Sequence, residues 1–288
     1  MIRGKPCFHR DKGFALVAVL WMVAALTLMV ASISYSVRGE TSRTAASRQS
    51  VILGAIAIAA INITLQEMLS SSKPIIHLSY KDIYYQEKLI RIEILPVNGL
   101  IDINNASESM LSRLISIQGG IDPDRALNLS RSIIEIRSIK DLKGHKRGFE
   151  SVEDLLHVPG IDYTLYAKIK DLVSVDLSGT RSGRVNALAA PQGVLNVLTG
   201  GNIEQAARIA SERDAGRVGI DTTMLSTSDL ETTSIDRYRI SACVPTSTEM
   251  KLWASQTIDI APGKLSRSPW RIFNAERLLK PACHNRMS

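Results

Sequence analysis

The sequence predicts an α+β protein with a long N-terminal helix, an antiparallel sheet and an inserted helical domain. Three patterns support this class: an uncharged apolar run near the start, β-branched or alternating segments on either side of the middle region, and paired helical segments between them. With 288 residues, the chain has room for two compact domains beyond a membrane segment.

The apolar run extends from Phe14 to Val37, 24 residues without a charge, and four basic residues precede it. As a helix it would be about 36 Å long, enough to cross a hydrocarbon core of about 30 Å. The basic residues favour a cytoplasmic N-terminus, so the chain after Arg38 is expected on the other side of the membrane. Two other interpretations stay open: a conventional signal cleaved at Ala31-Ser32, and a buried apolar helix of a soluble protein.

A second apolar block lies at residues 51–65, where Ala and Leu favour a helix. Its uninterrupted part, apart from Gly54, runs only from Val51 to Ile61, which is too short to cross a bilayer. We therefore predict that residues 38–73 form the second half of the same long helix, packed on a sheet and ended by Pro74.

Strand-like segments occur in two places. Residues 75–80 and 88–97 are rich in β-branched residues, and Asn98-Gly99 predicts a turn after them. Three further strands are predicted near the C-terminus, at residues 238–244, 249–260 and 268–278. We assign residues 74–100 and 173–288 to one α/β domain built around this sheet.

Paired helical segments begin at Ile101. Pro123 stands where a first helical residue would be, and Ser151 can cap a helix with acidic residues in its first turn. The turns within the three pairs are predicted at Gly119-Gly120, Pro159-Gly160 and Gly200-Gly201. The first two pairs define an inserted α-helical domain at residues 101–172.

Composition limits the functional classes. The net charge of +7 is weak support for nucleic-acid binding, and no motif brings a nucleophile and a base together, so we predict that the chain is not an enzyme. No Cys and His spacing is typical of a zinc site. Cys7 lies before the apolar run, whereas Cys243 and Cys283 lie after it and can form a disulfide in an oxidising compartment.

The junction Lys12-Gly13-Phe14 before the apolar run resembles the class III signal of type IV pilins and type II secretion pseudopilins. A peptidase needs an open backbone, which Gly13 supplies because it has no Cβ. The resemblance implies that residues 1–13 are a leader, removed between Gly13 and Phe14 on the cytoplasmic side by a prepilin peptidase, and that Phe14 is then N-methylated. Residues 14–37 are retained as a transmembrane helix.

Members of this family usually have Glu at the fifth mature position, where this chain has Ala18. A carboxylate within an apolar segment needs a partner, in this family the N-terminal amine of a neighbouring subunit. Absence of that Glu is typical of the K subunit of type II secretion. The segments "FESVEDLLHVPGIDYTLYAKI", "GRVNALAAPQGVLNVL" and "RIASERDAG" are similar to that family in the same order. The resemblance implies a pilin-like fold.

Two segments differ in sequence from the corresponding motifs of related proteins. The segment "VPGIDYTLYAKI" resembles a helix-hairpin-helix unit, but Asp162 replaces the second glycine of the DNA-binding version and would repel phosphate. K subunits can bind calcium on acidic loops, whereas residues 135–148 are basic and Asp141 alone is a poor site. We therefore expect a packing role for the hairpin, no nucleic-acid binding, no metal and no cofactor.

The resemblance predicts a minor pseudopilin at the tip of the type II secretion pseudopilus, which nucleates or caps its assembly for protein export. Its expected partners are the I-, J- and H-type minor pseudopilins, the prepilin peptidase and the inner-membrane secretion platform. The expected location is the bacterial inner membrane, with one membrane span and a periplasmic C-terminal domain. Two alternatives stay open: a minor pilin of a type IV pilus, and a membrane-anchored periplasmic nucleic-acid-binding protein.

Overall fold

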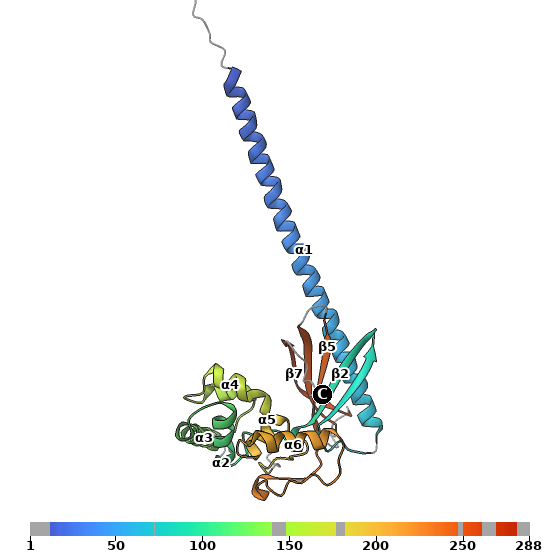
Figure 1. Cartoon of the computed structure of the whole chain (residues 1–288), viewed down its shortest axis with the longest axis vertical. Helices are drawn as coiled ribbons and strands as arrows, with labels where there is room; N and C mark the ends of the chain where they lie inside the picture. The colour runs from blue at the N-terminus through green and yellow to red at the C-terminus, as the bar shows by residue number, and fades with distance from the viewer. Residues whose placement is uncertain are drawn as a thin grey trace, which may run out of the picture. The chain divides into compact units, whose positions relative to one another are not determined.

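The computed structural model describes residues 12–71, 73–139, 148–176, 182–246, 250–260 and 269–280, with the side chains of 12–15, 31–46 and 280 excepted. The chain divides into two compact units, Met1–Leu53 and Gly54–Ser288. Helix α1, Lys12–Ser70, contributes to both. The predicted α+β class, with a long N-terminal helix and an antiparallel sheet, is confirmed (Figure 1).

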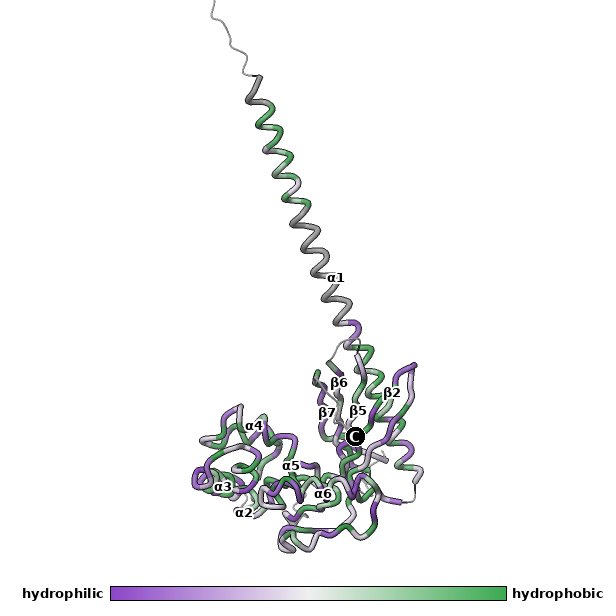
Figure 2. The backbone as a smooth tube through the Cα atoms, in the orientation of Figure 1, coloured by the Kyte–Doolittle hydropathy of each residue, from purple (hydrophilic) through white to green (hydrophobic). Residues whose placement is uncertain are grey.

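The first unit is the N-terminal part of α1. Residues 16–30 are apolar apart from Thr27 (Figure 2). Their side chains are exposed, with Leu20 at 71% and Trp21 at 73%. Among the described residues, the stretch that is long and apolar enough to cross a membrane by length and composition is Ser47–Ser70, and 44% of that window is buried in the protein. The partial burial of Ser47–Ser70 agrees with packing on the sheet, whereas the N-terminal apolar part of α1 that contains Leu16–Val30 fits a single-pass membrane anchor.

The second unit contains a five-stranded sheet in the order β1-β2-β5-β6-β7, in which all neighbours are antiparallel. β2 pairs directly with β5, although the two strands are far apart in the sequence. Residues 97–236 are therefore an excursion between two neighbouring strands. The strands are β1 Ser79–Tyr85, β2 Lys88–Pro96, β5 Arg237–Pro245, β6 Lys251–Asp259 and β7 Arg271–Lys280.

The C-terminal part of α1 packs on one face of this sheet. Glu67 of α1 forms an ion pair with Lys81 of β1, and the backbone at Gly54 lies against the Arg277 side chain of β7. α1 thus contacts both edge strands. Between helix and sheet lies an apolar layer of alternate strand residues, as the period of two requires. Its buried members include Ile56, Ala57, Ala60, Ile61, Leu65, Ile90, Ile92, Ile94, Ile240, Ala242, Val244, Leu252, Ala254 and Ile258.

The excursion is built from short helices around a core of its own. Two short strands, β3 and β4, pair in parallel at its base. Its elements are η1 Val97–Gly99, β3 Ile101–Asp102, α2 Glu108–Arg113, the π-helical turn η2 Leu114–Gln118, α3 Pro123–Ser138, η3 Val152–His157, α4 Tyr163–Ile169, η4 Lys170–Leu172, β4 Val173–Ser174, α5 Gln192–Leu198, α6 Ile203–Asp214 and η5 Thr227–Asp229.

Local signals explain where several of these helices begin. Pro123 is the first residue of α3, and the Asp122 carboxylate accepts a hydrogen bond from the Asp124 N–H. At the start of η3, the Asp154 carboxylate accepts hydrogen bonds from the N–H groups of Glu150 and Ser151, at 2.8 and 3.0 Å.

The excursion is larger than the predicted insertion at residues 101–172. α5 and α6, which the sequence-based division placed with 173–288, share one core with α2 and α4. The reason is burial: Leu195 and Ile209 are both fully buried in that core, so the third helical pair packs with the first two. At the other boundary, β1 begins at Ser79, later than the expected strand at 75–80.

Candidate assembly site

The predicted processing site lies in the first turn of α1. Lys12, Gly13 and Phe14 have helical backbone, and residues 1–11 of the expected leader are outside the described residues. Cleavage of the Gly13–Phe14 bond therefore requires this turn to open. Glycine makes the opening easier by about 1 kcal/mol relative to alanine. Ala18 lies one turn further and is exposed; its role and the cleavage stay predictions.

The part of α1 in the second unit has a second, uncharged and largely apolar face, opposite the sheet. Ala55 and Asn62 are exposed, and Ile58, Ala59 and Ile63 are half-buried. These positions follow the three- and four-residue spacing of one helix face. No charged residue occurs between Arg48 and Glu67 in the sequence. Alanines four residues apart leave room for the backbone of another helix to approach closely.

The turn of the hairpin before α4 packs against α3. Gly160 has a φ of +91°, and a Cβ there would lie 2.8 Å from Cδ2 of Leu129 on α3. The Asp162 carboxylate accepts a hydrogen bond from the Leu165 N–H at 2.7 Å, so it caps α4. A phosphate would meet this negative charge at the position where the DNA-binding hairpin offers free amides. The geometry agrees with a packing role.

Of the two cysteines predicted to form a disulfide, one lies within the described residues. Cys243 on β5 is 2% exposed and is disulfide-bonded. Cys283 lies outside the described residues, so its pairing with Cys243 stays a prediction. Asp141 lies outside them as well. Within the part of the chain that the structure describes, no three His, Cys, Asp or Glu side chains are grouped to hold a metal ion.

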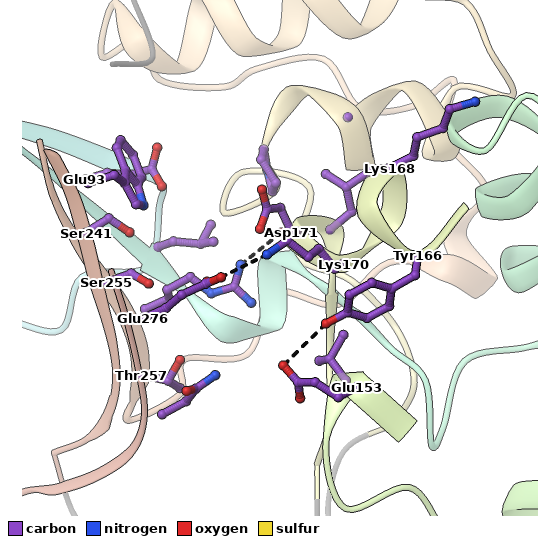
Figure 3. A pocket seen from close by; sticks show the side chains of 18 of the residues that line it. Glu93, Glu153, Tyr166, Lys168, Lys170, Asp171, Ser241, Ser255, Thr257 and Glu276 are labelled. Carbon is purple, nitrogen blue, oxygen red and sulfur yellow. Dashed lines mark hydrogen bonds and ion pairs between the residues drawn. The ribbon is translucent and has the colours of Figure 1, made fainter. Parts of the chain in front are cut away.

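A cleft of about 400 Å³ lies between the other face of the sheet and the excursion. In Figure 3, strand residues such as Ser255 and Thr257 lie opposite Tyr166 and Lys170 of the excursion. The lining residues are Glu93, Leu95, Gln118, Val152, Glu153, Tyr166, Lys168, Lys170, Asp171, Leu172, Pro191, Gly193, Arg239, Ser241, Trp253, Ser255, Thr257, Asn274 and Glu276.

Ion pairs and hydrogen bonds join the two sides of this cleft. The Lys170 ammonium of η4 lies 2.9 Å from a carboxylate oxygen of Glu276 on β7. Burial lowers the pKa of Lys170, but the hydrogen bond and charge of Glu276 outweigh it and raise that pKa above its usual value. The Arg239 guanidinium donates to the carbonyl oxygens of Asp171 and Val173.

Tyrosine and glutamate side chains are also paired around the cleft. The Tyr166 hydroxyl donates to Glu153 at 3.4 Å, and burial, followed by the Glu153 charge, raises the pKa of Tyr166. Tyr80 on β1 donates to Glu93, and burial is the main cause of its raised pKa. The sequence did not indicate this cleft because its residues come from distant segments that only the folded chain brings together.

These features define an α+β protein with one long N-terminal helix that fits a membrane anchor, and with a helical excursion inserted between two neighbouring strands. Among solved structures, the chain is similar to a chain of the GspK-GspI-GspJ complex from the type 2 secretion system of enterotoxigenic Escherichia coli. The two share 16% sequence identity over 83% of this chain and 99% of that chain, with a TM-score of 0.49. No protein-family model and no curated protein matches the sequence.

Proposed function

We propose that the protein is a minor pseudopilin of a type II secretion system, of the K type, that acts at the tip of the pseudopilus. The observation that carries the proposal is the single helix α1, Lys12–Ser70. It begins at the pilin-like junction Gly13–Phe14, continues through an apolar run with Ala18 in place of Glu, and ends with an outward apolar face on the sheet domain.

The proposed mechanism is assembly. A prepilin peptidase removes the leader, and the segment Phe14–Val37 holds the subunit in the inner membrane with its C-terminal domain in the periplasm. The outward face around Ala55 and Ala59 then packs against the corresponding helices of I-, J- and H-type minor pseudopilins. Without a carboxylate at position 18, the subunit makes no contact with an N-terminal amine above it, which suits the end of a filament.

The excursion at residues 97–236 supplies the bulk that would block addition of a further subunit. The tip complex would then nucleate or cap a filament on the inner-membrane platform, which drives protein export through the outer membrane. The role is structural, and no enzymatic step is proposed. The Asp162 cap argues against the nucleic-acid-binding alternative.

Mass spectrometry of the N-terminus tests the processing step. We would express the full chain with a prepilin peptidase and compare it with a Gly13→Leu variant. The expected mature chain begins at methylated Phe14, and the variant keeps its leader because the side chain blocks the junction. A Gly4→Leu variant in the leader is the matched control and should be processed normally.

An intact wild-type N-terminus, or a new one near Ala31, would contradict the proposal. Processing alone does not separate pseudopilins from type IV pilins, so complementation follows. The chain is expected to restore secretion to a strain that lacks its K-type pseudopilin. Restored twitching or adhesion in a minor-pilin deletion strain, without restored secretion, would support the type IV pilus alternative instead.

A further inference from the structure

The floor of the cleft is a regular array of hydrogen-bonding side chains. Strand register places Glu93, Ser241, Ser255 and Glu276 in one row across four neighbouring strands. Thr257 and Asn274 face each other in the adjacent row beside Arg239. Neighbouring strands are about 4.8 Å apart, so hydroxyl and amide groups recur at that spacing.

The neutral members of this array have no hydrogen-bond partner within the described part of the chain. Among the described residues, the side chains of Ser241, Ser255, Thr257 and Asn274 form no hydrogen bond. Ser241 is only 1% exposed, although it lines the cleft. A nearly buried hydroxyl without a protein partner needs water or a ligand to satisfy it.

The charged groups, by contrast, are already engaged. Lys170 is paired with Glu276, Glu93 accepts from a tyrosine, and Lys168 donates to the Gly119 carbonyl oxygen at 2.8 Å. Arg239 is bound by two carbonyl groups. What the cleft offers to an incoming molecule is therefore a set of neutral donors and acceptors, and this disfavours nucleic acids and other polyanions.

The lining also has an apolar part, which includes Leu95, Leu172, Pro191 and the Trp253 side chain. Sugar rings present both hydroxyl groups and apolar faces, so they match a mixed lining of this kind. A peptide is a poorer match, because the backbone groups of the floor strands are already paired within the sheet and offer no main-chain hydrogen bonds.

We propose that this cleft binds a neutral oligosaccharide. Ser241, Ser255, Thr257 and Asn274 hydrogen-bond the sugar hydroxyls, and the apolar lining contacts a ring face. The cleft volume of about 400 Å³ lies within the usual range for small-molecule sites and accommodates a short saccharide. The proposal is independent of the pseudopilin assignment, because it depends only on the cleft.

The test uses the full chain in detergent micelles and saturation-transfer NMR with two neutral trisaccharides, maltotriose and tri-N-acetylchitotriose. The two cleft variants are Thr257→Val, which keeps the shape and removes the hydroxyl, and Asn274→Leu. Matched controls are Thr232→Val and Asn128→Leu, two exposed positions outside the cleft. Circular dichroism melting of each variant confirms that the fold is retained.

The expected result is millimolar binding of at least one saccharide, weakened about fivefold to tenfold by each cleft variant and unchanged in the controls. The loss corresponds to one hydrogen bond to a neutral ligand. No saccharide binding by the folded wild-type chain would overturn the proposal. Saccharide binding by both folded cleft variants that is as strong as that of the wild type would also overturn it. So would preferential binding of a heparin fragment or an unstructured peptide.

Discussion

At the scale of single residues, Gly160 shows how the turn before α4 packs closely against α3. Its φ of +91° disfavours any side chain, and Leu129 occupies the space where a Cβ would be. Gly216 also has a positive φ, +69°, but no atom of the described residues lies within 4 Å of the position that a Cβ would take there. The two glycines therefore separate the cost of backbone conformation from the cost of a steric clash.

Gly160→Ala is expected to lower the free energy of unfolding by more than Gly216→Ala does. Both variants incur about 1–2 kcal/mol for a left-handed alanine. Gly160→Ala also forces Cδ2 of the nearly buried Leu129 to move, which adds about 1 kcal/mol. Urea unfolding of the detergent-solubilised chain measures both. If the two variants lost the same amount of unfolding free energy, Leu129 would move away freely and the hairpin would be loosely packed.

Asp154 provides a pH-dependent contribution to stability. Burial raises the pKa of this carboxyl group, but hydrogen bonds from the Ser151 and Glu150 N–H groups outweigh it, so the folded-state pKa lies below the usual 3.8. A lowered folded-state pKa stabilises the fold above pH 3.8. The stabilisation is lost as the pH falls through the folded-state value.

Asp154→Asn is therefore expected to reduce stability by about 1 kcal/mol near neutral pH. The difference from the wild type should shrink and vanish as the pH falls below the folded-state pKa of Asp154. Glu135→Gln, at an exposed position on α3, is the control and should show no such difference. Thermal melting across the acidic range measures it, and a difference that persists in strong acid would rule out the carboxylate as its source.

At the scale of elements, α1 has two apolar faces in the second unit with different uses. One face is buried on the sheet through residues such as Ile61, and the opposite face around Ala55 is exposed. A charge on the outward face should leave the subunit folded, since the Ala55 side chain is exposed. It should prevent a partner helix from packing there, because a charge buried in a helix interface is costly.

Ala55→Glu is expected to abolish co-purification with I- and J-type minor pseudopilins without lowering the melting temperature. The control is Ser50→Glu, an exposed position on the preceding polar stretch of α1, which should co-purify normally. Affinity purification from co-expressing cells, followed by native mass spectrometry, gives the stoichiometry. Normal co-purification of Ala55→Glu would exclude this face as the assembly surface.

At the scale of the whole molecule, one sheet is completed by strands from both ends of the domain. β2 and β5 are neighbours, so the excursion enters and leaves at one place, next to the paired β3 and β4. Antiparallel neighbours need only a short connection, which allows a large helical region to be added without changing the sheet. The cleft lies where this added region faces the polar side of the sheet.

The sequence by itself determined the features that depend on local chemistry. Apolar run length predicted the anchor-like helix, Pro123 predicted the start of α3, and the C-terminal segments between Pro and Gly turns predicted strands close to their observed places. These signals are local because capping, backbone restriction and side-chain periodicity act within a few residues.

Tertiary structure alone decided which segments meet. The pairing of β2 with β5, and the burial of Leu195 and Ile209 in the core of the earlier helices, moved the limits of the insertion from 101–172 to 97–236. The cleft that Lys170 and Glu276 help to line was equally invisible in the sequence. Such contacts arise because apolar faces are buried wherever the chain can bring them together, and that choice depends on all segments at once.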